Sequence, residues 1–281
     1  MKLVTLKSDG TSAPQLGRVE GDRILPFTYP GGMLELIRAG QPGLDAARAA
    51  AGPGLPLSEA GLAAPLTFPT KIVAIGKNYA DHAAETKSKV PERPLAFTKF
   101  TTAIIGPNDL VTWDPALTSS VDYEGELAVI IGKTARRVSQ AEALNHVFGY
   151  TCANDVSARD LQYGDGQWVR GKSLDTFCPL GPWLVTADEL PNPQTLDIKC
   201  EINGTVMQHS NTSKMIFSVA YLISFLSQSF TLLPGDIILS GTPDGVGGFR
   251  EPPIFMQNGD EMAVEIEGIG RLVNTCRTET A

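Results

Sequence analysis

The stretch of sequence that decides the fold runs Val121-Asp-Tyr-Glu-Gly-Glu-Leu-Ala-Val-Ile-Ile-Gly-Lys133. Its apolar run ends at a glycine, which is typical of a buried β-strand. Because side chains two apart in a strand point to the same face, Glu124 and Glu126 are expected to project together. Gly125 between them leaves the opposite face open to a close neighbour. Two carboxylates this close repel each other unless a proton or a cation lies between them.

A third acid ends the next apolar run, Val147-Phe-Gly-Tyr-Thr-Cys-Ala-Asn-Asp155. Glu124, Glu126 and Asp155 together predict an all-oxygen, strongly negative site, which suits Mg²⁺ or Mn²⁺ better than Zn²⁺. The alternative is that Glu-x-Glu lies on the exposed face of an edge strand, as most charged residues do. A basic residue and an amide within two turns of Asp155, and then Lys172, favour the metal site.

The composition limits the class of protein. With 281 residues, 42% apolar and 19% charged, the chain is an ordinary globular protein with an ample core. Its net charge of -8 argues against a nucleic-acid partner, which would need a basic surface. No apolar run is long enough to cross a bilayer, and the first residues lack the apolar core of a signal peptide. The four cysteines show no C-x-x-C spacing, so neither a zinc site nor a disulfide framework is predicted. We expect a cytoplasmic protein without a membrane partner.

The chain divides by texture into two parts. Residues 1–65 predict short strands with two short helices, at Met33–Arg38 and Leu44–Ala51, and contain no catalytic constellation. They are expected to form a small accessory α/β domain. The two prolines that follow Ala64 predict a linker. Residues 70–281 predict many strands and few helices, and therefore a β-rich α+β catalytic domain.

Within that larger part, three local patterns predict secondary structure. Asn203-Gly204 between alternating segments predicts a β-hairpin. The apolar spacing of Phe217–Ser227 predicts an amphipathic helix. Ser157 followed by Asp160 resembles a capping box at the start of a helix.

Three further stretches suggest functional residues. His82 and Glu85 are three apart on a predicted helix and so share a face, and the polar, proline-broken segment 87–94 follows them. Histidine is the usual general base, although His82 could equally be an exposed helical histidine. Lys99 lies in an apolar strand, where a lysine needs a partner. The glycine-rich loop after Leu239 is not a P-loop. It reads either as a plain strand end or as backbone N–H groups that, with the Thr242 hydroxyl, hold an anion.

These stretches together resemble the fumarylacetoacetate hydrolase family over roughly residues 70 to 276. The resemblance is carried by their order and combination: Gly76-Lys-Asn-Tyr-Ala-Asp-His-Ala-Ala-Glu85, Asp122-Tyr-Glu-Gly-Glu-Leu, Asn154-Asp-Val-Ser-Ala-Arg-Asp-Leu-Gln162, Gly171-Lys-Ser-Leu-Asp-Thr-Phe and Leu239-Ser-Gly-Thr-Pro-Asp-Gly-Val-Gly. It implies a β-roll catalytic domain that carries one divalent cation, in a homodimer, with a small N-terminal domain like that of bacterial members.

The resemblance also implies roles for individual residues. Glu124, Glu126 and Asp155 would be the metal ligands, and Lys172 the active-site lysine. His82 and Glu85 would form a water-activating dyad on a lid. The substrate contacts would be Lys99, Arg159, Gln162 and Thr242.

The chemistry of such a site accepts a 2-oxo acid. Cleavage of the C3–C4 bond of an acylpyruvate, or another 2,4-dioxo acid, leaves pyruvate enolate, whose charge a cation and Lys172 would stabilise. Hydrolysis of that bond is the expected reaction. Oxaloacetate decarboxylation and 2-hydroxydienoate isomerisation pass through a similar enolate and stay open. A catalytically silent metal-binding protein would need neither Lys172 nor His82.

Overall fold

Strand β11 (Gly125–Ile131) lies in the middle part of the large sheet of a computed structural model, which describes residues 1–7, 15–81 and 90–279. The strand begins one residue later than Glu124. The strands of the large sheet follow one another in the order β4 (Leu55–Pro56), β3 (Arg23–Phe27), β2 (Gln15–Glu20), β1 (Lys2–Leu6), β14 (Cys178–Thr186), β12 (Val147–Asn154), β11, β17 (Ile237–Leu239), β6 (Ile72–Gly76) and β7 (Leu95–Lys99). Two short strands pair outside this order, β5 (Leu62–Ala63) with β1 and β8 (Ile104–Ile105) with β14.

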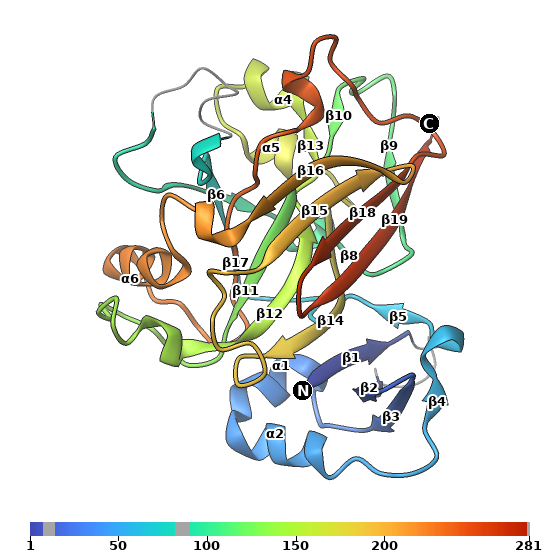
Figure 1. Ribbon diagram of the computed structural model, residues 1–281, viewed down its shortest axis with the longest axis vertical. Coiled ribbons are helices and arrows are strands. Elements are labelled where there is room, and N and C mark those ends of the chain that lie inside the picture. The colour runs from blue at the N-terminus through green and yellow to red at the C-terminus, as the bar shows by residue number, and fades with distance from the viewer. Residues whose placement is uncertain (8–14, 82–89, 280–281) are drawn as a thin grey trace.

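A second sheet packs against the middle of the first, with β15, β18 and β19 facing β11, β12 and β14 (Figure 1). Its order is β16 (Thr205–Asn211), β15 (Asp197–Ile202), β18 (Glu261–Ile266), β19 (Gly270–Thr278) and β9 (Leu110–Trp113). The hairpin between β15 and β16 turns at Asn203 and Gly204, whose φ angles of 50° and 76° are both positive, as a two-residue type I′ turn requires. The predicted hairpin is therefore confirmed.

The alternation of side chains along β11 divides the core into two layers. Leu127, Val129 and Ile131 belong to the cluster that faces the second sheet. Ala128 and Ile130 belong to the cluster on the other face, with residues of the N-terminal part. A Cβ on Gly125 would lie 3.2 Å from Cβ of Cys200 in the second sheet, so this glycine admits the close neighbour that the sequence predicts.

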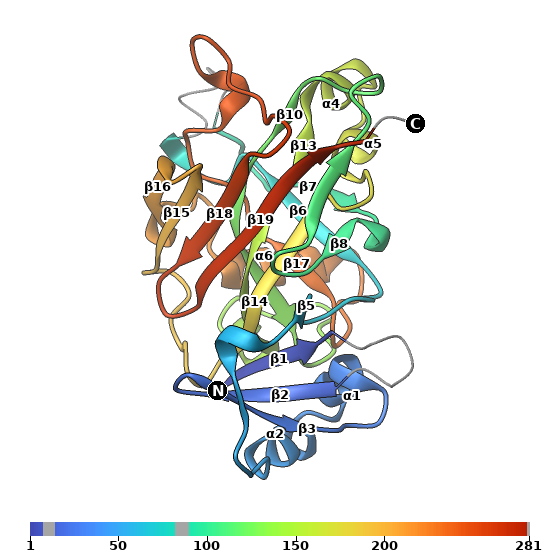
Figure 2. The same cartoon turned by 90° about the vertical axis from the view of Figure 1, so that its right-hand side faces the viewer.

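The N-terminal part continues the large sheet. Strand β1 pairs antiparallel with β14, so that Leu3 lies opposite Leu184. The two helices that the sequence predicts here are α1 (Gly32–Ala39) and α2 (Gln41–Arg48). In both views these elements lie at the opposite end of the molecule from α4 and α5 (Figures 1 and 2). The division into two domains near residues 65–70 stays a prediction.

The far end of the molecule is built by a small pair of strands, β10 (Val121–Asp122) and β13 (Ser157–Ala158), and by α4 (Arg159–Gly164) and α5 (Val169–Lys172). The predicted capping box at α4 is wrong. The Ser157 hydroxyl donates to the carbonyl of Asp155 at 2.8 Å, and Ala158 precedes the helix without a side-chain cap.

The amphipathic helix is present as α6 (Val219–Ser229), and the Ser218 hydroxyl accepts the backbone N–H of Tyr221 at its start. None of the described helices is both long enough and apolar enough to span a membrane. The β-rich α+β class is confirmed.

Candidate metal centre and active-site pocket

Three buried acids meet where β11 and β12 pair. Gly125 lies opposite Asn154 in that antiparallel pair, and the N–H of Asp155 donates to the carbonyl of Glu124 at 2.9 Å. The pairing brings Glu124, Glu126 and Asp155 together, so that one oxygen of each lies within 4.8 Å of the others. The predicted cluster therefore forms, and on buried positions rather than on an exposed edge.

Two buried lysines surround the cluster. The Nζ of Lys172 donates to Oε2 of Glu124 and to Oδ2 of Asp155, both at 2.8 Å. The Nζ of Lys99 donates to Oδ1 of Asp155 at 2.5 Å and to the carbonyl of Val156 at 3.1 Å. A lysine in an apolar strand needs a partner, and the partner of Lys99 is Asp155.

Lys172 stays charged in this setting. Burial by itself lowers the pKa of Lys172, but Asp155 and Glu124 raise it, and the net shift is upward. An ammonium group has three N–H donors, and two of them are used on the carboxylates. The third has no hydrogen-bond acceptor among the described residues, and the ammonium lies over the ring of Phe97, 5.3 Å from its centroid, at the wall of the pocket that both residues line.

Glu126 has the opposite character. Burial first, and then the charges of Asp155 and Glu124, raise its pKa well above the usual range. A single backbone N–H, that of Gly241, donates to its Oε2 at 2.7 Å. A divalent cation in the cluster would offset the repulsion by Asp155 and Glu124 that contributes to this shift.

The residues present fit such a cation. The donors are all carboxylate oxygens, the set that Mg²⁺ and Mn²⁺ prefer. Carboxylate oxygens carry more than one lone pair, so an oxygen that accepts a lysine proton can still bind a cation. Glu124 and Asp155 form ion pairs with Arg159, Lys172 and Lys99, whereas Glu126 has no ion-pair partner among the described residues. A divalent ion would provide one.

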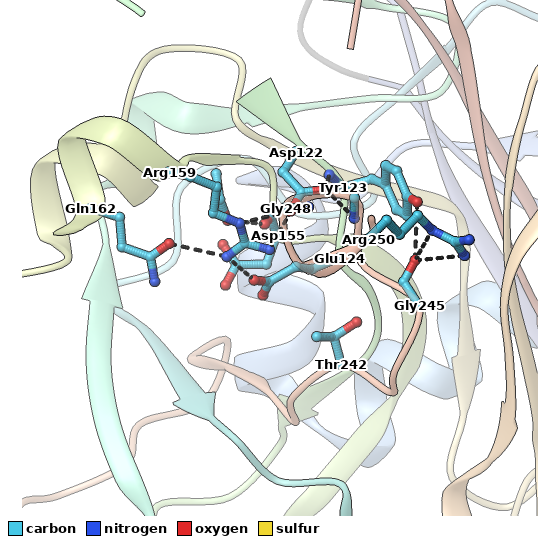
Figure 3. Close-up of polar contacts among 12 residues, drawn as sticks. Asp122, Tyr123, Glu124, Asp155, Arg159, Gln162, Thr242, Gly245, Gly248 and Arg250 are labelled. Carbon is cyan, nitrogen blue, oxygen red and sulfur yellow. Dashed lines mark hydrogen bonds and ion pairs between the residues drawn. The ribbon is translucent and has the colours of Figure 1, made fainter. Parts of the chain in front are cut away.

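Arg159 connects the cluster of three acids to a fourth acid, Asp122 (Figure 3). Its Nη1 donates to Oε1 of Glu124 at 2.6 Å and to Oε1 of Gln162 at 3.0 Å, while its Nε donates to Oδ2 of Asp122 at 2.7 Å. Burial lowers the pKa of Arg159, but the charges of Asp122 and Glu124 raise this pKa by more, so the net shift is upward.

A cavity of about 250 Å³ opens beside this network. Five of the predicted residues line it, namely Glu124, Arg159, Gln162, Lys172 and Thr242. The other lining residues are Ile75, Gly76, Lys77, Phe97, Tyr163, Trp168 and Phe249. Lys99 is not among them, and its role as a substrate contact stays a prediction. His82 and Glu85 lie outside the described residues.

The backbone N–H groups of the glycine-rich loop donate hydrogen bonds to carboxylate side chains of the same protein. The N–H of Gly241 donates to Glu126, and those of Gly247 and Gly248 donate to Asp122. The Thr242 hydroxyl donates to the carbonyl of Gly125 at 3.1 Å and accepts the amide of Gln208 at 2.8 Å. These N–H groups are therefore engaged by carboxylates.

Sequence reasoning missed several residues of the site. Asp122 stands two residues before Glu124, yet no local pattern assigns it a role. Phe97 and Trp168, whose rings meet edge to face with centroids 5.3 Å apart, come from β7 and the segment before α5. Lys77 follows β6 with a positive φ of 56°. A lysine directly after a buried strand was the only available signal for it.

A buried triad of acids with two lysines, at the end of packed β-sheets, is a set of residues suited to hold a divalent cation. Residues 71–277 match the family model described as Fumarylacetoacetate (FAA) hydrolase C-terminal, and the chain belongs to that family.

Relatives cover nearly the whole chain. It is 46% identical to "Oxaloacetate tautomerase FAHD2A, mitochondrial" of Bos taurus, over 98% of this chain and 91% of the relative. Among solved structures, it is similar to a fumarylacetoacetate hydrolase of Exiguobacterium antarcticum, with 39% identity, a TM-score of 0.88 and coverage of 99% of this chain and 100% of the other. It is also similar to a maleylpyruvate hydrolase of Sphingobium sp. SYK-6, with 33% identity, a TM-score of 0.83, and coverage of 99% and 100%.

Proposed function

We propose that this protein is a divalent-metal-dependent enzyme that forms and stabilises the enolate of a small 2-oxo acid, with oxaloacetate as its substrate and keto–enol tautomerisation as its reaction. The observation that carries the proposal is Lys172, which two cluster carboxylates hold at the wall of the cavity with one N–H to spare. The relative from Bos taurus favours oxaloacetate over other 2-oxo acids.

Glu124, Glu126 and Asp155 would hold the cation, Mg²⁺ or Mn²⁺. When bound, it supplies Lewis-acid polarisation of the 2-oxo group. The residues of the chain supply the rest. The ammonium of Lys172 stabilises the negative charge that develops on the enolate oxygen, because a charged donor in a buried site costs no reorganisation at the moment of reaction. Arg159, and Gln162 through its amide group, would orient the carboxylate of the substrate.

Hydrolysis of an acylpyruvate is the second candidate, and the maleylpyruvate hydrolase structure favours it. It requires a base that activates water, and that role falls to His82 with Glu85. Stabilisation of an enolate by Lys172 would serve both reactions.

Turnover of enol-oxaloacetate and of acetylpyruvate with saturating Mg²⁺ tests the proposal. Loss of the enol absorbance reports tautomerisation, and pyruvate release from oxaloacetate reports decarboxylation. We expect metal-dependent tautomerisation by the wild type and none by Glu126→Ala. Acetylpyruvate cleavage without tautomerisation would instead identify the hydrolase. A cytoplasmic location and a homodimer stay proposals; the relative from Bos taurus is named mitochondrial.

A further inference from the structure

Asp122 is a buried acid that lies beside the cluster of Glu124, Glu126 and Asp155 without belonging to it. Its Oδ1 accepts the N–H groups of Tyr123 and Gly247, both at 2.8 Å. Its Oδ2 accepts the N–H of Gly248 at 2.9 Å and Nε of Arg159 at 2.7 Å (Figure 3). A buried carboxylate with four donors is held firmly in place, so it can in turn hold what it touches.

One group that it holds is the glycine-rich loop. A Cβ on Gly247 would lie 1.9 Å from the carbonyl oxygen of Ile254 and 2.8 Å from Oδ1 of Asp122. A Cβ on Gly248 would lie 3.1 Å from Oδ2 of Asp122. Only glycine permits the backbone to approach the carboxylate this closely. The next residue, Phe249, lines the cavity. Asp122 therefore fixes the part of the loop that forms this wall.

The other group is the guanidinium of Arg159. Besides the hydrogen bond from Nε, its Nη2 lies 2.7 Å from Oδ2 of Asp122, a contact that is an ion pair but lacks hydrogen-bond geometry. The guanidinium is planar and rigid, so the position of two nitrogens determines that of the third. The third nitrogen, Nη1, is the one that reaches Glu124 and Gln162.

Gln162 receives its orientation through this contact. Its Oε1 accepts Nη1 of Arg159, so its amide NH₂ group is the end that remains for the cavity that Gln162 lines. An amide in the opposite orientation would present an acceptor to an anionic substrate. Asp122 fixes Arg159, and Arg159 in turn fixes the orientation of the Gln162 amide. These contacts therefore determine whether Gln162 presents a hydrogen-bond donor to the cavity.

We infer that Asp122 is a positioning residue for substrate binding. It acts through Arg159 and the Gly247–Gly248 backbone, and it touches neither the bound cation nor the substrate. This inference rests on the proposed function of the same site. It assigns Asp122 to the affinity for the anionic substrate, whereas the affinity for the cation depends on Glu124, Glu126 and Asp155.

The test is Asp122→Asn, which keeps the shape of the side chain and replaces an acceptor with a donor. Calorimetry measures the Kd of Mg²⁺, and then the Kd of oxalate for the Mg²⁺-loaded protein, and neither requires turnover. We expect the oxalate Kd and the KM for oxaloacetate to rise about tenfold or more, the scale of a lost hydrogen bond to a charged group. The Kd of Mg²⁺ should change less, because Lys172 still holds Glu124.

The matched control is Asp160→Asn. Asp160 adjoins Arg159 and accepts the Thr118 hydroxyl and the backbone N–H of Leu161, but it is exposed and does not line the cavity. This variant should lower the unfolding temperature with little change in oxalate affinity. If Asp122→Asn behaves in the same way, Asp122 is a structural residue only and the inference is overturned.

A double-mutant cycle tests the path through Arg159. On an Arg159→Lys background, which keeps the charge and loses the planar fork, Asp122→Asn should weaken oxalate binding much less than in the wild type. Equal losses on both backgrounds would show that Asp122 acts independently of Arg159. Failure of the proposed function would appear differently, as a wild type that binds Mg²⁺ and oxalate but does not turn over oxaloacetate.

Discussion

The Nζ of Lys172 lies 2.8 Å from Oδ2 of Asp155, although 17 positions separate the two residues along the chain. Lys172 is at the end of α5 and Asp155 directly follows β12, so the contact joins the small helices at the far end of the molecule to the central sheet. It also places a permanent positive charge beside the acids that would bind the cation. The chemistry of the site depends on this contact.

Replacement of Lys172 by methionine should reduce kcat by about a hundredfold or more, the usual cost of one lost charge-stabilising donor. Methionine keeps the length of the side chain and removes the charge. Steady-state kinetics with saturating Mg²⁺ measure the effect, and thermal unfolding in Mg²⁺ should show little loss. Lys7→Met is the control, since Lys7 forms an exposed pair with Asp109. A large fall in unfolding temperature with normal kcat would assign Lys172 a structural role.

Glu126 should make the stability of the metal-free protein depend on pH. Its folded-state pKa is raised, so the folded protein keeps a proton that the unfolded chain releases above about pH 4.3. The stabilisation is complete below that pH and is lost as the pH rises toward the raised pKa. With chelator, the wild type should therefore lose more stability than Glu126→Gln between about pH 5 and pH 7.5.

Addition of Mg²⁺ should reverse this trend, because the cation replaces the proton and binds more tightly as the pH rises. Thermal unfolding of both proteins, with chelator and with Mg²⁺, provides the four curves required. Parallel pH dependence of wild type and Glu126→Gln under both conditions would contradict the assignment of Glu126 to the cation.

Lys77 should select substrates with a second carboxylate. It lines the cavity, its backbone has a positive φ of 56°, and no described acid pairs with it. A non-glycine residue in this conformation is strained, and strain of this kind concentrates at functional sites. Lys77→Asn suits the same backbone and removes the charge. The KM for oxaloacetate should rise about tenfold, the scale of one lost charged hydrogen bond, while that for acetylpyruvate should not change. Equal rises for both would exclude this role.

His82 should separate the two candidate reactions. Hydrolysis needs a base that activates water, so His82→Ala should reduce acetylpyruvate cleavage by about a hundredfold or more. The affinity for Mg²⁺ should stay nearly constant, and oxaloacetate tautomerisation should lose less, since it requires no attacking water. Measurement of kcat for both substrates, in the wild type and in His82→Ala, decides whether His82 activates the attacking water. Equal losses would indicate that His82 serves closure or binding.

Local patterns were sufficient for much of this protein. The apolar run after Glu126 identified β11, and Asn203-Gly204 identified the hairpin between β15 and β16. Strand periodicity and turn chemistry depend on neighbours in the chain, so they can be read from the sequence. The three acids were found because two of them stand beside a buried strand and the third ends another. Buried acids of this kind require compensation wherever they occur.

Only the tertiary structure decided the partners of these acids. Ser157 looked like a helix cap, but the pairing of β13 with β10 places its hydroxyl on the carbonyl of Asp155. Lys99 needed a partner, and only the packing of β7 decided that this partner is the same acid. Asp122 had no local signal, and its partners Arg159 and Gly247 lie far along the chain. Which donor meets which buried carboxylate depends on distances through space and on the loss of water around both groups, and local sequence patterns record neither.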